Sequence, residues 1–239
     1  MIQVSEIFGP TIQGEGPSIG QRAMFLRLAG CNLQCKWCDS AYTWRFSKKQ
    51  PHAKGKVYER QEETFSIARH EVAQRLDPIG QGGSLLVITG GEPLLQQREL
   101  ACLIDLLAFR RIEIETAGTI GASTQLRSFS HVWYSVSPKL ANAGIPFIRR
   151  IKPEALHEFA FCPRAYFKFV VASVADLDEV MKICDMCSIP QGKVYLMPLG
   201  TGTRDLNASL KAWGPAAVEM GFNITTRLHV YLWGNRRGV

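Results

Sequence analysis

The chain has 239 residues, of which 46% are hydrophobic and 21% charged, and its formal net charge is +7. This balance is that of an ordinary globular protein long enough for a sizeable core, and we expect neither a membrane span nor a secretory signal. Much of the positive charge is dispersed and no nucleic-acid-binding motif accompanies it, so we expect a solvated basic face or a site for anionic substrates rather than a nucleic-acid partner.

The N-terminal part consists of a polar, glycine-rich lead over residues 1–22, a first predicted strand at 23–29 and a polar, aromatic-rich insert over 39–62. Strand and helix patterns then alternate up to a C-terminal extension over 222–239. Neither a convincing linker nor a low-complexity segment interrupts the chain. We therefore expect a single domain over residues 1–239.

The rest of the chain alternates between strand and helix patterns. Runs rich in β-branched and aromatic residues predict strands at 85–89, 111–116, 132–136, 166–171, 194–197 and 224–233. Longer segments predict helices at 63–76, ended by Asp77 and Pro78, at 94–109, at 176–187 with Asp176 as N-cap, and at 207–220. This order indicates an α/β fold of parallel βα units, and about six core strands are too few for a closed barrel of eight.

Three closely spaced cysteines follow the first predicted strand. Cys31, Cys35 and Cys38 give the pattern C-x3-C-x2-C, at the carboxyl end of a strand, where α/β enzymes place their active sites. A structural zinc site or an ordinary iron–sulfur cluster takes four protein ligands, so three thiolates leave one metal position open for chemistry. A structural zinc site with a distant fourth ligand is the alternative. The seven cysteines are odd in number, which argues against a secreted disulfide framework and for reduced thiols in the cytoplasm.

With Trp37 before the last cysteine, the triplet resembles the C-x3-C-x-aromatic-C signature of the radical S-adenosylmethionine (SAM) superfamily. The resemblance implies a partial (β/α)6 barrel, which agrees with the independent strand count. It implies a [4Fe-4S] cluster held by Cys31, Cys35 and Cys38, with SAM bound at the open iron. Cleavage of SAM would yield a 5'-deoxyadenosyl radical that removes a hydrogen atom from the substrate.

Other strand ends resemble SAM-binding segments of the same superfamily. They are residues 89–93, with the sequence Thr-Gly-Gly-Glu-Pro, residues 137–139, and residues 197–200. The glycines permit close approach of a ligand to the backbone, and a tight strand-to-helix turn also uses them. The resemblance implies that SAM is bound by Lys36, Trp37, Cys38, Asp39, Gly91, Glu92, Ser137, Pro138, Lys139 and Met197.

The lead at 6–16 and the chain end at 229–239 extend the resemblance, over essentially the whole chain, to the 7-carboxy-7-deazaguanine synthase family. This family converts 6-carboxy-5,6,7,8-tetrahydropterin to 7-carboxy-7-deazaguanine with loss of ammonia, in queuosine and deazapurine biosynthesis. The resemblance implies a homodimer, an electron donor such as flavodoxin, and Mg²⁺ bound by Ser40, where many members carry Thr. A serine that caps a helix or turn is the alternative for Ser40. The implied substrate-binding residues are Ile12, Gln13, Gly14, Glu15, Arg27, Thr89, His229 and Val239.

Arg27 is also informative on physical grounds. It shares a face of the first predicted strand with Phe25 and Ala29, and a guanidinium there needs a compensating anion. A substrate carboxylate would supply it through a two-pronged charge-assisted pair, and a core Asp or Glu is the alternative. For His229, on the last predicted strand, a structural role is the alternative, because no acidic partner lies nearby in sequence.

Two further features invite a functional interpretation. Cys184 and Cys187 form a second C-x2-C pair, but they lie in a predicted helix without a second pair, so we expect ordinary helix positions. The insert at 45–60 predicts a solvated loop, although its lysines would also attract an acidic flavodoxin. These lysines are Lys48, Lys49, Lys54 and Lys56.

Two other functions remain open on the sequence. A radical SAM activase of a glycyl-radical enzyme would share the cysteines but would not need Gln13, Glu15 and Arg27 as a cradle for a pterin. A non-enzymatic metal-binding module that acts on RNA would bind zinc or a cluster without cleaving SAM.

Overall fold

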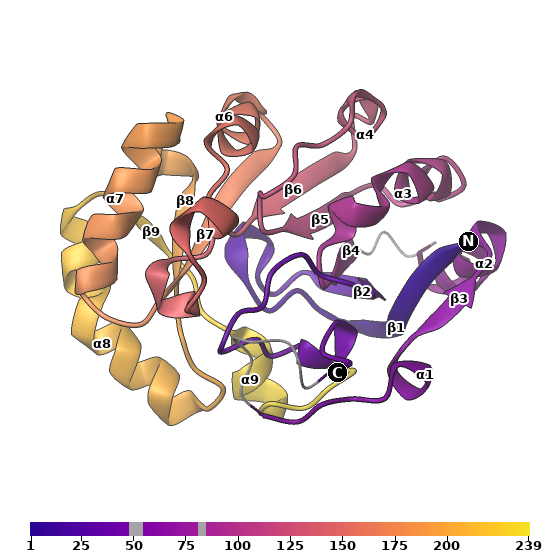
Figure 1. Ribbon diagram of the computed structural model, residues 1–239, viewed down its shortest axis with the longest axis horizontal. Coiled ribbons are helices and arrows are strands. Elements are labelled where there is room, and N and C mark those ends of the chain that lie inside the picture. The colour runs from indigo at the N-terminus through magenta and orange to yellow at the C-terminus, as the bar shows by residue number, and fades with distance from the viewer. Residues whose placement is uncertain (48–54, 81–84) are drawn as a thin grey trace.

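A computed structural model describes residues 1–47, 55–80 and 85–239 of the chain. Within this part, the strands form one sheet in the order β3-β1-β2-β4-β5-β6-β7-β8-β9 (Figure 1). Neighbouring strands from β2 to β9 are parallel, whereas β1 pairs antiparallel with both β2 and β3. The strands are β1 (Ile2–Ile12), β2 (Arg22–Leu28), β3 (Phe65–Ile67), β4 (Leu85–Gly90), β5 (Ile112–Thr116), β6 (Val132–Val136), β7 (Ala165–Val171), β8 (Val194–Pro198) and β9 (Asn223–Ile224).

Helices cover the outer face of the curved sheet, which does not close, because β3 and β9 remain at its two edges (Figure 1). The outer helices are α2 (Arg69–Gly80), α3 (Gln97–Ile104), α4 (Thr124–Ser128), α6 (Pro153–Phe161), α7 (Ala175–Cys187) and α8 (Thr203–Glu219). The shorter ones are α1 (Arg60–Glu63), α5 (Phe147–Arg150), α9 (Leu228–Trp233), and the 3-10 turns η1 (Gly16–Ser18), η2 (Ala41–Thr43), η3 (Pro93–Gln96), η4 (Ala141–Ala143) and η5 (Gln191–Lys193). The predicted partial barrel of parallel βα units is confirmed.

The main core lies between the sheet and these helices. Parallel strands buried on both faces read as nearly continuous apolar runs, and all seven residues of β7 are buried. On β2 the side chains alternate: Leu26 and Leu28 belong to the main core, whereas Phe25 and Arg27 face the opposite side of the sheet. This alternation directs the polar side chain of Arg27 towards the concave face, where the candidate site lies.

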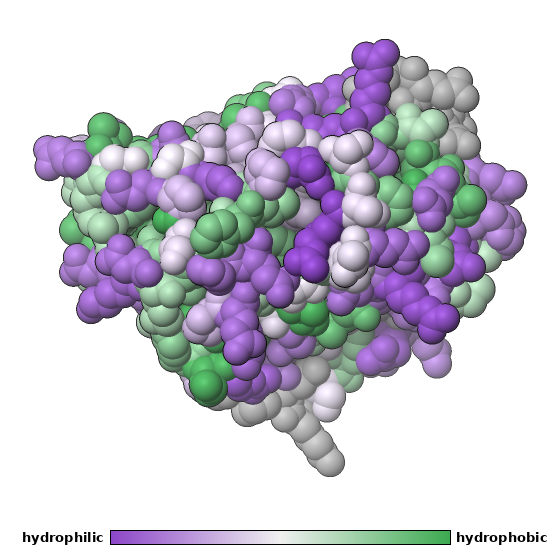
Figure 2. Space-filling view, turned by 90° about the horizontal axis from the view of Figure 1, so that it is seen from above, coloured by the Kyte–Doolittle hydropathy of each residue, from purple (hydrophilic) through white to green (hydrophobic). Residues whose placement is uncertain are grey.

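The outer surface is mixed in character. The face in Figure 2 interleaves hydrophilic and hydrophobic residues, and no broad hydrophobic area stands out on it. None of the helices in the described part of the chain combines the length and apolar character that a membrane span requires. Cys184 and Cys187 are buried in the main core on α7, as expected for ordinary helix positions.

Several predicted elements differ from the structure. No strand was predicted in the lead, but half of it forms β1. The register of β1 with β2 shifts at two places, so the alternation of its side chains is broken and hard to read from the sequence. The helix predicted at 63–76 is three elements, α1, β3 and α2, and α2 continues past Pro78. Asp176 lies inside α7 rather than at its N-cap, and its carboxylate accepts hydrogen bonds from the preceding loop.

The C-terminal segment also differs. The strand predicted at 224–233 is only the two-residue β9 followed by α9, so His229 lies on a helix. The aromatic and β-branched residues of this segment favour a strand locally, and its contacts with the lead decide otherwise. Lys48, Lys49 and Lys54 of the insert lie outside the described residues.

Candidate active site

A cavity of about 290 Å³ opens at the carboxyl ends of β2, β4, β5, β6, β7 and β8. Its wall also includes the lead, the cysteine loop and the C-terminal tail at 235–239. Of the residues predicted from the sequence, the following line it: Ile12, Gln13, Gly14, Glu15, Arg27, Cys31, Cys35, Trp37, Cys38, Asp39, Ser40, Thr89, Gly91, Ser137, Lys139, Met197, His229 and Val239. Lys36, Glu92 and Pro138 are not part of this wall.

The three predicted cysteines share one side of the cavity. They pack with an apolar cluster that includes Ala143 and Ile145. Burial raises the pKa of Cys31 to about 12 and that of Cys35 to about 11, so these thiols keep their protons until a cation replaces them. The indole of Trp44 donates a hydrogen bond of 3.3 Å to the sulfur of Cys38, which favours negative charge there.

This donor set fits an iron–sulfur cluster. Among the described residues, no three His, Cys, Asp or Glu side chains converge on a point where one metal ion would sit. A [4Fe-4S] cluster binds each cysteine sulfur at a different corner, so its ligands are spread along a surface rather than gathered around a point. Three thiols on one apolar wall, with a hydrogen bond to a sulfur, suit such a cluster.

Gly90 and Gly91 let the end of β4 touch the segment that enters the cysteine loop. The amide of Gly91 donates to the Leu28 carbonyl at 3.1 Å. A Cβ on Gly91 would lie 2.0 Å from the Gly30 carbonyl oxygen, and one on Gly90 would lie 2.2 Å from that of Leu28. The glycines are therefore required by close packing, and Gly91 still lines the cavity.

Glu92 is fully buried behind the cavity wall. Its carboxylate accepts hydrogen bonds from the Leu94 amide at 3.0 Å and from the Thr116 hydroxyl and Ala117 amide at 2.8 Å each. Burial raises the pKa of Glu92 in spite of these donors. Through these hydrogen bonds Glu92 connects the ends of β4 and β5, and its side chain does not line the cavity.

Ser137, Lys139 and Trp37 form a polar and aromatic part of the wall. The ammonium of Lys139 donates to the Ser137 hydroxyl at 2.9 Å and lies 5.9 Å from the centre of the Trp37 ring. An ammonium and a hydroxyl in this position suit a carboxylate ligand. Lys36, in contrast, is exposed, and its aliphatic part lies beside Gly144.

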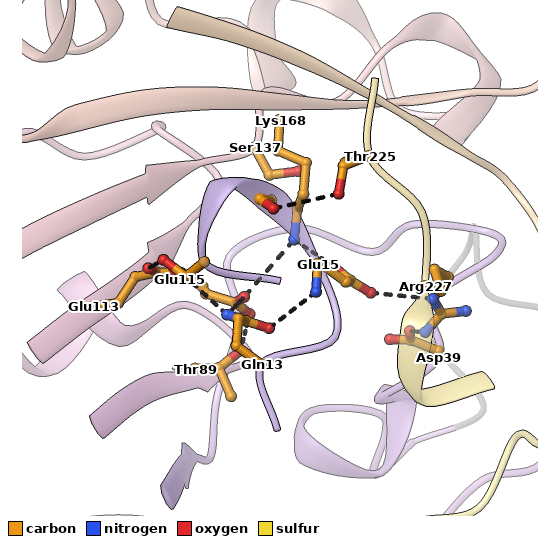
Figure 3. Close-up of polar contacts among 12 residues, drawn as sticks. Gln13, Glu15, Asp39, Thr89, Glu113, Glu115, Ser137, Lys168, Thr225 and Arg227 are labelled. Carbon is orange, nitrogen blue, oxygen red and sulfur yellow. Dashed lines mark hydrogen bonds and ion pairs between the residues drawn. The ribbon is translucent and has the colours of Figure 1, made fainter. Parts of the chain in front are cut away.

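The side chain of Gln13 is engaged with its neighbours (Figure 3). Its amide nitrogen donates to Glu113 at 3.0 Å and to Glu115 at 3.2 Å, and its oxygen accepts from the Glu15 amide at 3.3 Å. Glu113 is fully buried, and burial raises its pKa. Gln13 therefore holds the lead against β5 through its side chain.

Glu15 joins four distant segments of the chain. It pairs with Lys168 of β7 and, at 3.0 Å, with Arg227, which also pairs with Asp39 of the cysteine loop (Figure 3). Burial opposes the ionisation of Glu15, but Lys168, Arg227 and His229 outweigh it and hold the pKa of Glu15 well below its usual range. The network fixes the lead, the cysteine loop and the C-terminal segment to one another.

Arg27 has both a protein partner and free donors. Its Nε donates to Glu6 at 2.8 Å, and the Tyr42 hydroxyl donates to the same carboxylate oxygen at 2.9 Å. In the described part of the chain, the two terminal nitrogens of Arg27 make no hydrogen bond or ion pair. The alternative that a protein acid neutralises Arg27 therefore holds for its Nε, which pairs with Glu6. The two terminal nitrogens can still bind a carboxylate in a two-pronged pair.

His229 packs against the lead. The amide of Leu228, at the start of α9, donates to the Gly14 carbonyl at 2.8 Å. A Cβ on Gly14 would lie 1.9 Å from the His229 Nδ1, so only glycine lets the ring fit. Burial lowers the pKa of His229 below its usual value. Val239 lines the cavity beyond it.

Ser40 is buried and lines the cavity. It precedes η2 but makes no side-chain cap, so the capping alternative is not realised. Its hydroxyl oxygen lies 3.8 Å from the sulfur of Cys38. The Ser40 hydroxyl therefore lies in the cavity wall next to the cysteine loop.

Sequence reasoning missed several charged residues of this site, among them Glu6, Glu115, Lys168, Arg227 and Arg237. Lys168 had a signal, because it is the one charged residue of the otherwise apolar run 165–171. Glu115 had a weaker signal in the alternation of β5, with two acids on the face opposite the main core. Glu6 and Arg227 lie in segments whose contacts come from residues far away in sequence.

Comparisons with known proteins identify the family. A family model described as a 4Fe-4S single cluster domain matches residues 12–121. The chain is 37% identical to the 7-carboxy-7-deazaguanine synthase of Pyrobaculum aerophilum, over 99% of this chain and 97% of that protein. It is 39% identical to the 7-carboxy-7-deazaguanine synthase of Bacillus cereus, over 100% of this chain and 99% of that protein.

Solved structures share the fold. QueE from Escherichia coli superposes with a TM-score of 0.68 at 24% identity, covering 95% of this chain and 94% of that one. SuiB from Streptococcus suis, solved with S-adenosylmethionine bound, gives a TM-score of 0.50 at 15% identity, covering 82% of this chain and 48% of that one.

Proposed function

The chain belongs to the 7-carboxy-7-deazaguanine synthase family, and on this premise we propose that it converts 6-carboxy-5,6,7,8-tetrahydropterin to 7-carboxy-7-deazaguanine with loss of ammonia. One observation carries the proposal. A single cavity has three cysteine thiols on one side and, on another, an arginine with two free terminal nitrogens. The first side suits a radical-generating cluster and the second suits the carboxylate of the substrate.

Different residues of the chain would bind the cluster and SAM. Cys31, Cys35 and Cys38 would hold the [4Fe-4S] cluster, and Ser137 and Lys139 would bind the carboxylate of SAM. When bound, the cluster and SAM supply the radical that removes a hydrogen atom from the substrate. The match to a 4Fe-4S single cluster domain supports this assignment.

At the substrate end, Arg27 would bind and orient the carboxylate with its free nitrogens. Ser40 would offer one oxygen to Mg²⁺, with substrate and water completing its coordination, because Mg²⁺ favours few protein ligands. The lead and the tail would exclude water from the cavity.

We also propose that an acidic electron carrier such as flavodoxin reduces the cluster from the side of α5. The apolar residues Ala143 and Ile145, which pack with the cysteines, lie just before this helix. Phe147 and Ile148 are 44% and 74% exposed, an unusual exposure for apolar side chains so close to a reactive centre.

Several cations lie in or beside the segment that carries this exposed apolar pair. Lys36, Arg149 and Lys152 are exposed, whereas the nearby Glu179 is paired with the buried Arg150 at 2.6 Å. The exposed Glu154 is an acid in the same stretch. An apolar centre with a mainly basic rim complements an acidic partner. A homodimer, a cytoplasmic location and the absence of a nucleic-acid partner are proposed from the sequence resemblance and composition alone.

Anaerobic product analysis tests the function. Protein reconstituted with iron and sulfide should convert 6-carboxytetrahydropterin, in the presence of SAM and dithionite, to 7-carboxy-7-deazaguanine and ammonia. The Cys31→Ala variant should give no product. A glycyl radical formed on an added protein, without deazaguanine, would favour the activase, and a colourless protein that takes up only zinc would favour the RNA-binding module.

A further inference from the structure

Glu6 lies between two arginines from opposite ends of the chain. One of its oxygens accepts from Arg27 at 2.8 Å and from the Tyr42 hydroxyl at 2.9 Å, and the other pairs with Arg237 of the C-terminal tail. Arg237 also donates to Glu63 at 2.6 Å, and its guanidinium carbon lies 3.7 Å from the centre of the Tyr42 ring. The tail is therefore tied down at the one carboxylate that also holds Arg27.

Arg237 changes the charge around Arg27. Both carboxylates are well shielded, because the side chains of Glu6 and Glu63 are each only 13% exposed. When Arg237 is docked, the positive charges of the two arginines, Arg27 and Arg237, balance the negative charges of Glu6 and Glu63. With the tail withdrawn, one negative charge is left beside Arg27, at a position that water screens poorly.

The remaining acids near Arg27 do not alter this balance. Asp39 is paired with Arg227, and Glu115 lies 3.7 Å from Lys168. Both cations are shared with Glu15, and neither ion pair involves the tail, so this part of the network is the same whether or not Arg237 is docked. Glu63, in contrast, has its only ion-pair partner in the described part of the chain in Arg237. The state of the tail therefore decides whether the surroundings of Arg27 repel an anion.

We propose that Arg237 is a positioning residue for the substrate: by neutralising Glu6 and Glu63 it makes the free nitrogens of Arg27 available to a carboxylate. The inference rests on the proposed function, in which Arg27 binds the substrate carboxylate. Docking of the tail and capture of an anionic substrate are thereby coupled, since each favours the other through the same pair of acids.

Binding measurements on the reconstituted enzyme test this inference. Arg237→Ala should weaken binding of 6-carboxytetrahydropterin about tenfold, and Arg237→Lys should weaken it less. Neither change should alter the affinity for 6-methyltetrahydropterin, because this pterin has no carboxylate. In the Arg237→Ala background, Glu63→Gln removes the excess charge without touching Arg27, and should restore most of the affinity. Arg204→Ala, an exposed position on α8, is the control for loss of a positive charge.

Iron content and circular dichroism would establish that each variant is folded and loaded. Equal weakening for the two pterins, or no recovery with Glu63→Gln, would show that Arg237 only tethers the tail and would overturn the inference. Failure of the proposed function looks different, because the unchanged enzyme would then neither bind the carboxylated pterin nor form product.

Discussion

At the scale of single residues, Lys168 is the cation on which the buried acids depend. Its side chain is 7% exposed and lies between Glu15 and Glu115. Burial works against its charge, but the two acids outweigh burial and raise the pKa of Lys168, so the ammonium persists at neutral pH. Without Lys168, the shielded carboxylates of Glu15 and Glu115 would lose a cation that compensates their negative charge.

We therefore expect Lys168→Met to lower the free energy of unfolding by about 3–5 kcal/mol, the range for removal of one partner from a buried ion pair. The matched control is Lys211→Met, which removes an exposed lysine from α8 and should change stability by less than about 0.5 kcal/mol. Urea unfolding of both variants, followed by circular dichroism, makes the comparison. Equal midpoints would mean that Glu15 and Glu115 do not need this ammonium.

His229 gives a pH dependence whose sign follows from burial. Its pKa is lowered in the folded chain, so the unfolded chain binds the proton first as pH falls through about 6.5. The folded state therefore loses stability between that pH and the lower pKa of the folded state. His229→Gln should lose less stability than the unchanged chain between pH 7.5 and 5.5 in urea titrations. His70→Gln, at a position 70% exposed, should keep the original slope.

At the scale of elements, local pattern was enough where burial is simple. The strands β4, β6, β7 and β8 were predictable because each is a short apolar run between turn residues. The segments β1 and α9 were not, because β1 depends on its pairing with β2 and α9 depends on its contact with the lead at Gly14. Register shifts hide the alternation of β1, and α9 is helical where its residues favour a strand.

The contact between α9 and the lead can be tested at Gly14. An alanine there would place its Cβ 1.9 Å from the His229 ring, so α9 would have to move away from the lead. We expect Gly14→Ala to cost about 1–3 kcal/mol of stability, as overpacking does, and to raise KM for the pterin. Gly192→Ala, where a Cβ would meet nothing within 4 Å, is the control. A Gly14→Ala protein with unchanged stability and KM would show that this contact is not needed.

At the scale of the whole molecule, the site could be predicted in part. Ligand types that occur in one stretch, such as the cysteines, were visible, and Arg27 stood out as a charge on a buried strand. The network of Glu15, Lys168 and Arg227 was not visible, because it joins residues 15, 168 and 227 through the topology of the sheet. Lys36 and Glu92 show the converse: they lie within the right motifs, but one is exposed and the other is buried behind the wall.

The molecule must also admit electrons from outside, and α5 is where we expect them to enter. Reversing the charge at two exposed positions, Arg149→Glu and Lys152→Glu, should slow flavodoxin-driven turnover about tenfold and weaken its salt dependence, because charges at an interface mainly govern association. Turnover driven by dithionite, a small reductant, should stay unchanged.

The control reverses the same number of charges on α8, at Arg204 and Lys211, and should leave both rates intact. Equal slowing by the two double variants would mean that only net charge matters to the partner. Slowing with dithionite as well would mean that the α5 substitutions had damaged the cluster wall at Ala143 and Ile145. Only a loss confined to the protein donor and to the α5 variant would place the donor beside the cysteines.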